Sequence, residues 1–198
     1  MANKSEKKVP AVFFDRDGTL NVDTGYLHEK EKLQWMPEAR EAVKLANGRG
    51  YLAIVITNQS GVARGMFGEK AVRDLHAYMN EELGKIGAHL DGFYYCPHHP
   101  EAAVPEYRRD CDCRKPKSGL IDKACKDFAI DLEHSLMVGD SPRDVECGEG
   151  AGVRGILYQG ESLLELVKKF ISARDTGGSL RLHLGKRKRY ATEMDWIG

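Results

Sequence analysis

The sequence contains no hydrophobic run close to the roughly 20 residues that a helix needs to cross a bilayer, so no membrane partner is expected. It also lacks an excess of charge, because 30 lysines and arginines balance 30 aspartates and glutamates. A chain without net charge has no long-range electrostatic field that would attract a polyanion such as nucleic acid. We therefore expect a small anionic substrate that is held by local groups, and no nucleic acid.

The N-terminus also lacks the central element of a secretion signal, because no hydrophobic stretch follows its first charged residues. We therefore expect a cytoplasmic protein. Its 198 residues are enough for one domain with a substantial core and too few for two domains of full size. We expect a monomer with one domain over residues 1–175 and a tail of uncertain structure at 176–198.

Segments typical of strands and of helices alternate along the chain. Short hydrophobic runs predict strands at residues 9–14, 52–56, 93–95, 135–138 and 155–158. Amphipathic patterns predict helices at residues 37–45, 69–86, 120–128, 143–151 and 161–173. This alternation is typical of right-handed crossovers, and it predicts an α/β fold: a Rossmann-like, mostly parallel sheet with helices on both faces.

Acidic residues follow two of the predicted strands. Asp15 and Asp17 come after the first strand, where Gly18 permits a tight turn, and Asp140 follows the strand at 135–138. Ligands of open α/β sheets bind beyond the carboxyl ends of the strands, and magnesium prefers oxygen ligands. We therefore expect Mg²⁺ at Asp15, Asp17 and Asp140, with Asp144 as support or as an outer ligand.

Phosphoryl transfer needs a nucleophile in line with the leaving group, a proton donor and positive groups around the phosphoryl oxygens. Asp15 is the expected nucleophile, which would form an aspartyl-phosphate. Asp17 would protonate the leaving oxygen and then deprotonate the attacking water. Thr57 would offer its hydroxyl and backbone N–H groups, and Lys115 would offset the negative charge.

These residues resemble the four ordered motifs of the haloacid dehalogenase (HAD) superfamily of phosphatases. The motifs are Asp15-Arg16-Asp17-Gly18-Thr19, Thr57-Asn58, Lys115 and Gly139-Asp140-Ser141-Pro142-Arg143-Asp144. The resemblance covers about residues 9–160 and implies that Asp17 contributes its backbone carbonyl to magnesium. Taken alone, an Asp-x-Asp-Gly sequence is more often a solvated turn or a calcium loop, and an inert scaffold is the corresponding alternative.

Three of the five cysteines lie together in a segment with little hydrophobic periodicity. Thiolates and imidazole suit tetrahedral zinc, and four protein ligands leave no open position. An odd number of clustered cysteines without a secretion signal disfavours disulfides. We expect a structural Zn²⁺ that staples a loop at about 96–113. Its expected ligands are Cys96, His98, Cys111 and Cys113, with His99 competing for the place of His98.

The zinc segment resembles a branch of the superfamily that acts on a heptose bisphosphate or on histidinol phosphate. Residues 23–28 and 57–65 look like those of the heptose-specific members of this branch. That resemblance implies release of the 7-phosphate from heptose 1,7-bisphosphate, in activated-heptose and lipopolysaccharide precursor synthesis. The expected substrate contacts are Asp23, Thr24, Gly25, Tyr26, Thr57, Asn58, Gln59, Ser60, Arg114 and Lys115.

One position departs from that branch, in which a lysine can follow the last motif aspartate, because this chain has Ser141 there. A cationic contact is therefore missing or supplied elsewhere. The sequence shows no insertion large enough for a separate cap domain, so we expect an open site.

The tail carries the basic run Lys186-Arg187-Lys188-Arg189, which suggests a nucleic-acid binding module or a strand-end phosphatase as an alternative. A short basic run is more often a solvated tail, and the balanced net charge provides no wider footprint for nucleic acid.

Overall fold

The computed structural model describes residues 7–175, and the tail at 176–198 with its basic run lies outside the described residues. Five parallel strands form one sheet in the order β3-β2-β1-β4-β5. The strands are β1 (Ala11–Phe14), β2 (Leu52–Asn58), β3 (Gly92–Cys96), β4 (Leu136–Gly139) and β5 (Arg154–Leu157). The predicted parallel α/β fold is therefore confirmed.

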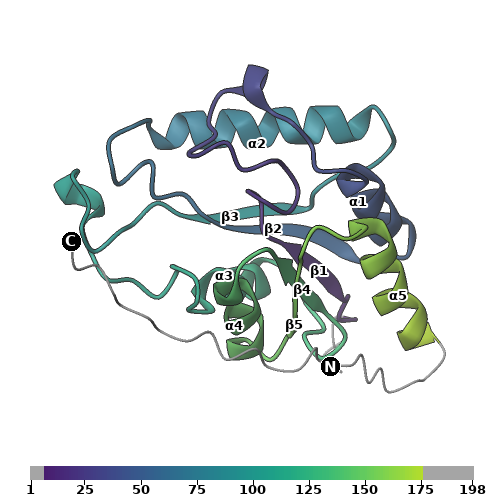
Figure 1. Cartoon of the computed structure of the whole chain (residues 1–198). Coiled ribbons are helices and arrows are strands. Elements are labelled where there is room, and N and C mark those ends of the chain that lie inside the picture. The colour runs from purple at the N-terminus through teal and green to yellow at the C-terminus, as the bar shows by residue number, and fades with distance from the viewer. Residues whose placement is uncertain (1–6, 176–198) are drawn as a thin grey trace, which may run out of the picture.

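Helices cover both faces of the sheet, as Figure 1 shows. They are α1 (Ala39–Gly48), α2 (Glu69–Gly84), α3 (Gly119–Asp127), α4 (Pro142–Gly150) and α5 (Leu163–Asp175), with short 3₁₀ turns η1 (Lys30–Lys32) and η2 (Pro105–Tyr107). Each predicted helix is present. The first begins two residues later than expected, because Glu38 at its N-cap has a left-handed φ of 58°.

The strand residues alternate between two hydrophobic cores. In β1, Val12 and Phe14 pack with residues of α1, α2 and α5, whereas Ala11 and Phe13 pack with residues of α3 and α4. All four side chains are fully buried. Burial on both faces explains why this strand appears in the sequence as an uninterrupted hydrophobic run.

The strand order reverses at β1. The chain builds outward from β1 through β2 to β3 and then returns to place β4 on the other side of β1. The backbone N–H of Asp15 donates to the carbonyl of Val138 at 2.9 Å, which holds the ends of β1 and β4 together. Such a reversal is where open α/β sheets bind their ligands, so it predicts the place of the site.

The described part of the chain contains neither a membrane-spanning helix nor a cap domain over this edge of the sheet. Within residues 7–175, no helix is both long and apolar enough to cross a membrane. Between β1 and α1, and between β3 and α3, the described chain contains only loops and the turns η1 and η2, and it forms no cap domain there. The expected absence of a large cap therefore holds for the described residues.

Candidate active site

Three carboxylates meet at the carboxyl ends of β1 and β4. Asp15, Asp140 and Asp144 each place a carboxylate oxygen within 4.8 Å of the other two. The Nζ of Lys115 lies 2.7 Å from Oδ1 of Asp15 and 2.6 Å from Oδ1 of Asp144. It also donates to the carbonyl of Ile56 at 2.8 Å. The loop before α3 therefore places the buried ammonium of Lys115 between the buried carboxylates of Asp15 and Asp144.

The charges of this cluster do not balance. Burial raises the pKa of Asp15 to about 6, against the lowering effect of Lys115 and with further increases from Asp144 and Asp17. Burial also raises the pKa of Asp140. Three carboxylates beside one ammonium leave a negative site that a divalent cation would neutralise, and an all-oxygen donor set suits magnesium. The residues present therefore fit the expected metal.

Gly18 makes room for this arrangement. Its φ is +86°, and a methyl group at its Cα would overlap the carboxylate of Asp140. Glycine is thus required twice at this position, once for the left-handed backbone and once for the close approach of a side chain.

Substituting Gly18 by alanine should lower kcat/KM by at least about 100-fold, because a displacement of about 1 Å at a catalytic group has an effect of that size. The substrate turnover of Gly18→Ala should also require more magnesium, since Asp140 must move. The measurement is phosphate release across a magnesium titration.

Gly87 offers a matched control, since its φ is +71° and nothing lies within 4 Å of the position that a Cβ would take. Gly87→Ala should cost about 1 kcal/mol of stability and leave turnover intact. Equal loss of activity in both variants would show that contact with Asp140 is not the cause.

The carboxylate of Asp17 is held apart from the other three. The Nη2 of Arg16 donates to both of its oxygens at 2.9 Å, and Nε donates to Oδ1 at 3.1 Å. Gln59 donates to Oδ2 at 2.9 Å and Asn21 donates to Oδ1 at 3.0 Å. Neither Arg16 nor Asn21 was among the site residues predicted from the sequence. The sequence signal that could have indicated Arg16 is its place between Asp15 and Asp17, and the structure shows that its side chain is buried there.

The residues at the end of β2 hold other residues of the site in place through hydrogen bonds. Thr57 is buried, and its hydroxyl accepts a hydrogen bond from Gln59 at 2.9 Å. Asn58 exchanges two hydrogen bonds with the backbone of Lys115, at 3.2 and 3.0 Å. We predicted Asn58 and Gln59 as substrate contacts. In the structure their amides hold Lys115 and Asp17 in place, and their contact with substrate stays a prediction.

Four of the predicted substrate contacts form an exposed rim beside the site, and these are Asp23, Thr24, Gly25 and Tyr26. Tyr26 is 40% exposed, and the guanidinium of Arg64 lies 5.8 Å from its ring centroid. The carbonyl of Leu27 accepts a hydrogen bond from Arg16 at 2.9 Å, which ties the rim to the acidic turn. Ser60, another predicted contact, is half-buried where the turn toward Arg64 begins.

Two residues after the rim, the ring of His28 stacks on Phe67 with centroids 4.4 Å apart. Neither Phe67 nor Arg64 was among the site residues predicted from the sequence.

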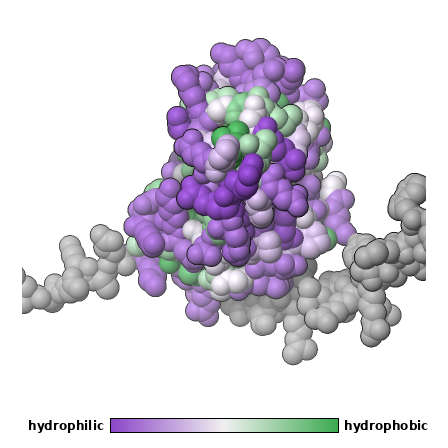
Figure 2. Space-filling model, turned by 90° about the vertical axis from the view of Figure 1, so that its left-hand side faces the viewer, coloured by the Kyte–Doolittle hydropathy of each residue, from purple (hydrophilic) through white to green (hydrophobic). Residues whose placement is uncertain are grey.

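Figure 2 shows the side of the molecule on which the loop after β3 lies, where hydrophilic residues predominate and a small hydrophobic group lies near the top. The exposed large hydrophobic residues among those described are Tyr26 and Met66.

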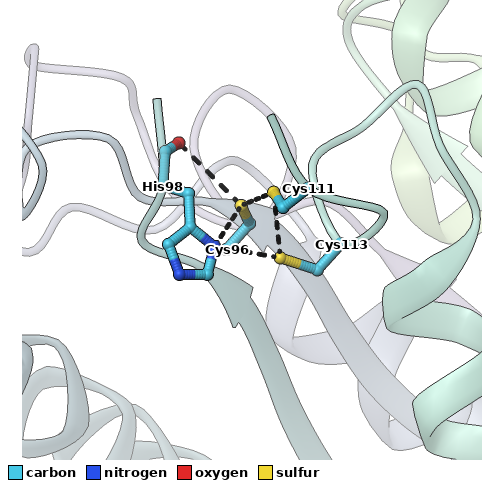
Figure 3. Close-up of side chains that lie close together, drawn as sticks. All are labelled: Cys96, His98, Cys111 and Cys113. Atoms are coloured by element: carbon cyan, nitrogen blue, oxygen red, sulfur yellow. Dashed lines mark hydrogen bonds between the residues drawn. The ribbon is translucent and has the colours of Figure 1, made fainter. Parts of the chain in front are cut away.

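The predicted zinc ligands also come together, as Figure 3 shows. The Sγ of Cys96 lies 3.5 Å from the Sγ of Cys111 and 3.8 Å from Nδ1 of His98. The Sγ of Cys113 lies 3.3 Å from the Sγ of Cys111 and 3.3 Å from Nδ1 of His98. Zinc bonds of about 2.3 Å to sulfur and 2.0–2.1 Å to nitrogen place tetrahedral ligand atoms roughly 3.6–3.8 Å apart. The four side chains therefore fit a zinc ion and form no disulfide.

His98, rather than its neighbour, faces the sulfur atoms. His99 lies outside the cluster, and its Nδ1 accepts a hydrogen bond from the backbone N–H of Glu101 at 3.1 Å. The geometry therefore favours His98 over the competing ligand that the sequence left open.

Backbone contacts join the zinc cluster to the acidic site. The carbonyl of Cys96 accepts a hydrogen bond from the N–H of Gln59 at 2.8 Å. Arg114, a predicted substrate contact, donates to the carbonyl of His98 at 3.2 Å. Lys115 follows the last cysteine of the cluster by two residues. A metal in this cluster would thus fix the segment that carries Lys115.

Known proteins resemble this chain in sequence and in fold. Residues 112–173 match the HAD-hydrolase-like family model. The D-glycero-beta-D-manno-heptose-1,7-bisphosphate 7-phosphatase of Rhodopseudomonas palustris is 42% identical over 167 residues, which cover 84% of this chain and 93% of that protein. The protein of the same name from Pasteurella multocida is 45% identical over 161 residues, covering 80% and 87%. The solved structure of D,D-heptose 1,7-bisphosphate phosphatase from B. bronchiseptica matches the fold with a TM-score of 0.68 at 24% identity, covering 83% and 99%.

Proposed function

The chain belongs to the haloacid dehalogenase superfamily, and from that premise we propose that it removes the 7-phosphate of D-glycero-β-D-manno-heptose 1,7-bisphosphate. The observation that carries the proposal is the buried Asp15–Lys115 pair beside Asp140 at the reversal of the sheet. It occurs in a chain that is 42% identical to a phosphatase of that name over 84% of its own length.

Asp15 is suited to attack phosphorus with one particular oxygen. Its Oδ1 accepts hydrogen bonds from Lys115 Nζ and from the backbone N–H of Arg16, each at 2.7 Å. These bonds orient the carboxylate and leave Oδ2 as the attacking atom. A bond forms between Oδ2 and phosphorus while the bond from phosphorus to the sugar oxygen breaks.

Asp17 would move the protons of both steps. It gives a proton to the leaving sugar oxygen and then takes one from the water that attacks the aspartyl-phosphate. The second step releases inorganic phosphate and restores the carboxylate of Asp15. The Lys115 ammonium and the Thr57 hydroxyl would stabilise the charge on the phosphoryl oxygens during both steps.

We propose Mg²⁺ as the divalent cation that this superfamily requires. Asp15, Asp140 and the backbone carbonyl of Asp17 would hold it. When bound, it neutralises charge on the carboxylates and on the phosphate and so lowers the cost of bringing anions together.

We also propose a structural Zn²⁺ in the cluster of Cys96, His98, Cys111 and Cys113. Four protein ligands leave no position for water or substrate. The role that fits the contacts is to position the segment of Lys115, and thus to support the reaction indirectly.

The rim of residues 23–26, together with Arg114, would meet the sugar and its second phosphate. Ser141 is a less suitable contact, because its backbone N–H donates to Oδ2 of Asp144 at 3.0 Å in a capping box that begins α4. The position after Asp140 therefore serves the start of the helix. The monomeric state, the cytoplasmic location and the absence of a nucleic-acid partner stay predictions.

A substrate comparison tests the proposal. The value of kcat/KM for the β-anomer of heptose 1,7-bisphosphate should exceed that for histidinol phosphate by at least about 100-fold, since sites built for a polar group reject substrates that lack it. The heptose 7-monophosphate and the α-anomer serve as controls for the second phosphate. A clear preference for histidinol phosphate would contradict the assigned substrate while leaving the mechanism in place.

A further inference from the structure

Arg16 is an unusual core residue, because its long charged side chain is 0% exposed. Its Nη2 donates to both oxygens of Asp17, to the carbonyl of Leu27 at 2.9 Å and to Oε1 of Gln59 at 3.2 Å. Its Nη1 lies 3.4 Å from Nε2 of His76 in α2. The guanidinium thus connects the acidic turn after β1 with a helix 60 residues further along the chain.

His76 is itself buried, with 4% exposure. Its ring stacks on Phe93 with centroids 4.5 Å apart and a 14° angle between the planes, and it meets the edge of Tyr95 at 5.9 Å. Burial, followed by the positive charge of Arg16, lowers the pKa of His76 to about 3, so the ring is neutral near pH 7. The two aromatic contacts fix the plane of the ring.

The direction of the contact follows from the chemistry of the two groups. A guanidinium only donates hydrogen bonds, and a neutral imidazole has one nitrogen that accepts and one that donates. Nε2 of His76 is therefore the acceptor, and its proton is on Nδ1. A neutral acceptor orients Arg16 without adding a charge that would repel it.

We infer that His76 is a positioning residue for the proton-transfer group, because it fixes the Arg16 fork that grips the carboxylate of Asp17. His76 does not touch the substrate. It acts through Arg16, whose planar donors must lie in the plane of the Asp17 carboxylate to reach both oxygens. The inference rests on the proposed function, in which Asp17 protonates the leaving oxygen.

The choice of leaving group separates this role from a structural one. A sugar alkoxide needs a proton as it leaves, whereas 4-nitrophenolate leaves without one. A displaced Asp17 should therefore slow phosphoryl transfer from the heptose bisphosphate but not from 4-nitrophenyl phosphate. Hydrolysis of the aspartyl-phosphate needs Asp17 with either substrate, so the aryl reaction should show a fast burst followed by slow turnover.

The test variant is His76→Phe, which keeps a stacked ring and removes the acceptor. We expect kcat for the heptose bisphosphate to fall about 10- to 100-fold, part of the full effect of general acid–base catalysis, with KM changed less than twofold. The burst of 4-nitrophenol should keep its wild-type rate. His76→Gln, which restores an acceptor at similar reach, should recover kcat to within about threefold of the wild type.

The controls distinguish the possible failures. Phe93→Leu loosens the ring stack but keeps the Nε2 acceptor, so its leaving-group effect should be clearly smaller than that of His76→Phe. The amplitude of the 4-nitrophenol burst is proportional to the number of active sites, so a misfolded fraction lowers the amplitude and leaves the burst rate unchanged. His76→Leu repeats the test with a smaller side chain.

Equal slowing of the burst and of sugar turnover in His76→Phe, or a leaving-group effect in Phe93→Leu as large as that in His76→Phe, would overturn the inference. Asp17→Asn shows where a failure lies. If Asp17→Asn has the leaving-group effect and His76→Phe does not, the inference alone is wrong. If Asp17→Asn lacks the effect, the proposed proton donor is wrong, and the inference falls with it.

Discussion

Substitution of Asp15 by asparagine is expected to lower kcat by at least about 10,000-fold, the scale on which the loss of a covalent nucleophile acts. The amide oxygen can still accept the hydrogen bonds from Lys115 and from the backbone N–H of Arg16, so the local packing should persist. Zinc content and the unfolding transition should therefore match those of the wild type.

The covalent step gives this prediction a direct readout. Acid quenching during turnover of phosphorus-labelled substrate should trap label on the wild-type protein and none on Asp15→Asn. Asp74→Asn makes the same chemical change at an exposed carboxylate of α2, whose pair with Lys70 lies on the surface and contributes little. That control should keep full activity, and unchanged activity in Asp15→Asn would refute the covalent mechanism.

Loss of the zinc cluster is expected to have the second large effect. The purified protein should contain one zinc per chain, and Cys111→Ser should lose it together with at least about 3 kcal/mol of stability, because the binding energy of a structural zinc contributes to folding. Turnover should fall as well, since the loop that carries Lys115 loses its anchor. Metal analysis, denaturant unfolding and phosphate release measure the three effects.

Cys125 provides the matched control for this experiment. It is also a half-buried cysteine, but it lies on α3 and outside the cluster. Cys125→Ser should keep its zinc and lose only about 1 kcal/mol. The prediction would be contradicted by wild-type protein without zinc, or by Cys111→Ser that retains it.

The parts of the site that the sequence predicted depend on the ends of strands or on short spacing. Asp15 and Asp140 directly follow hydrophobic runs, and parallel strands place their carboxyl ends at one edge of the sheet. The cysteines and histidine of the zinc cluster carry their own chemical signature. In both cases local sequence is sufficient, because the sheet or the metal brings the residues together.

The parts that the sequence did not predict depend on side-chain direction. Asn58 lies next to Thr57 in a strand, so the two side chains point to opposite sides, and Asn58 reaches the backbone of Lys115. The contact of Arg16 with His76 joins two segments with no shared pattern. Periodicity places His76 on the buried face of α2, but only the packed structure shows which group it meets.

The double hydrogen bond between Asn58 and Lys115 also limits how the chain can vary in length. The backbone of Lys115 is fixed to the end of β2 on one side. On the other side, it lies two residues from Cys113 of the zinc cluster. One inserted or deleted residue in this short span would turn the ammonium away from Asp15, because neither anchor can move to compensate. The span should therefore accept other side chains at Arg114 far more readily than any change in its number of residues.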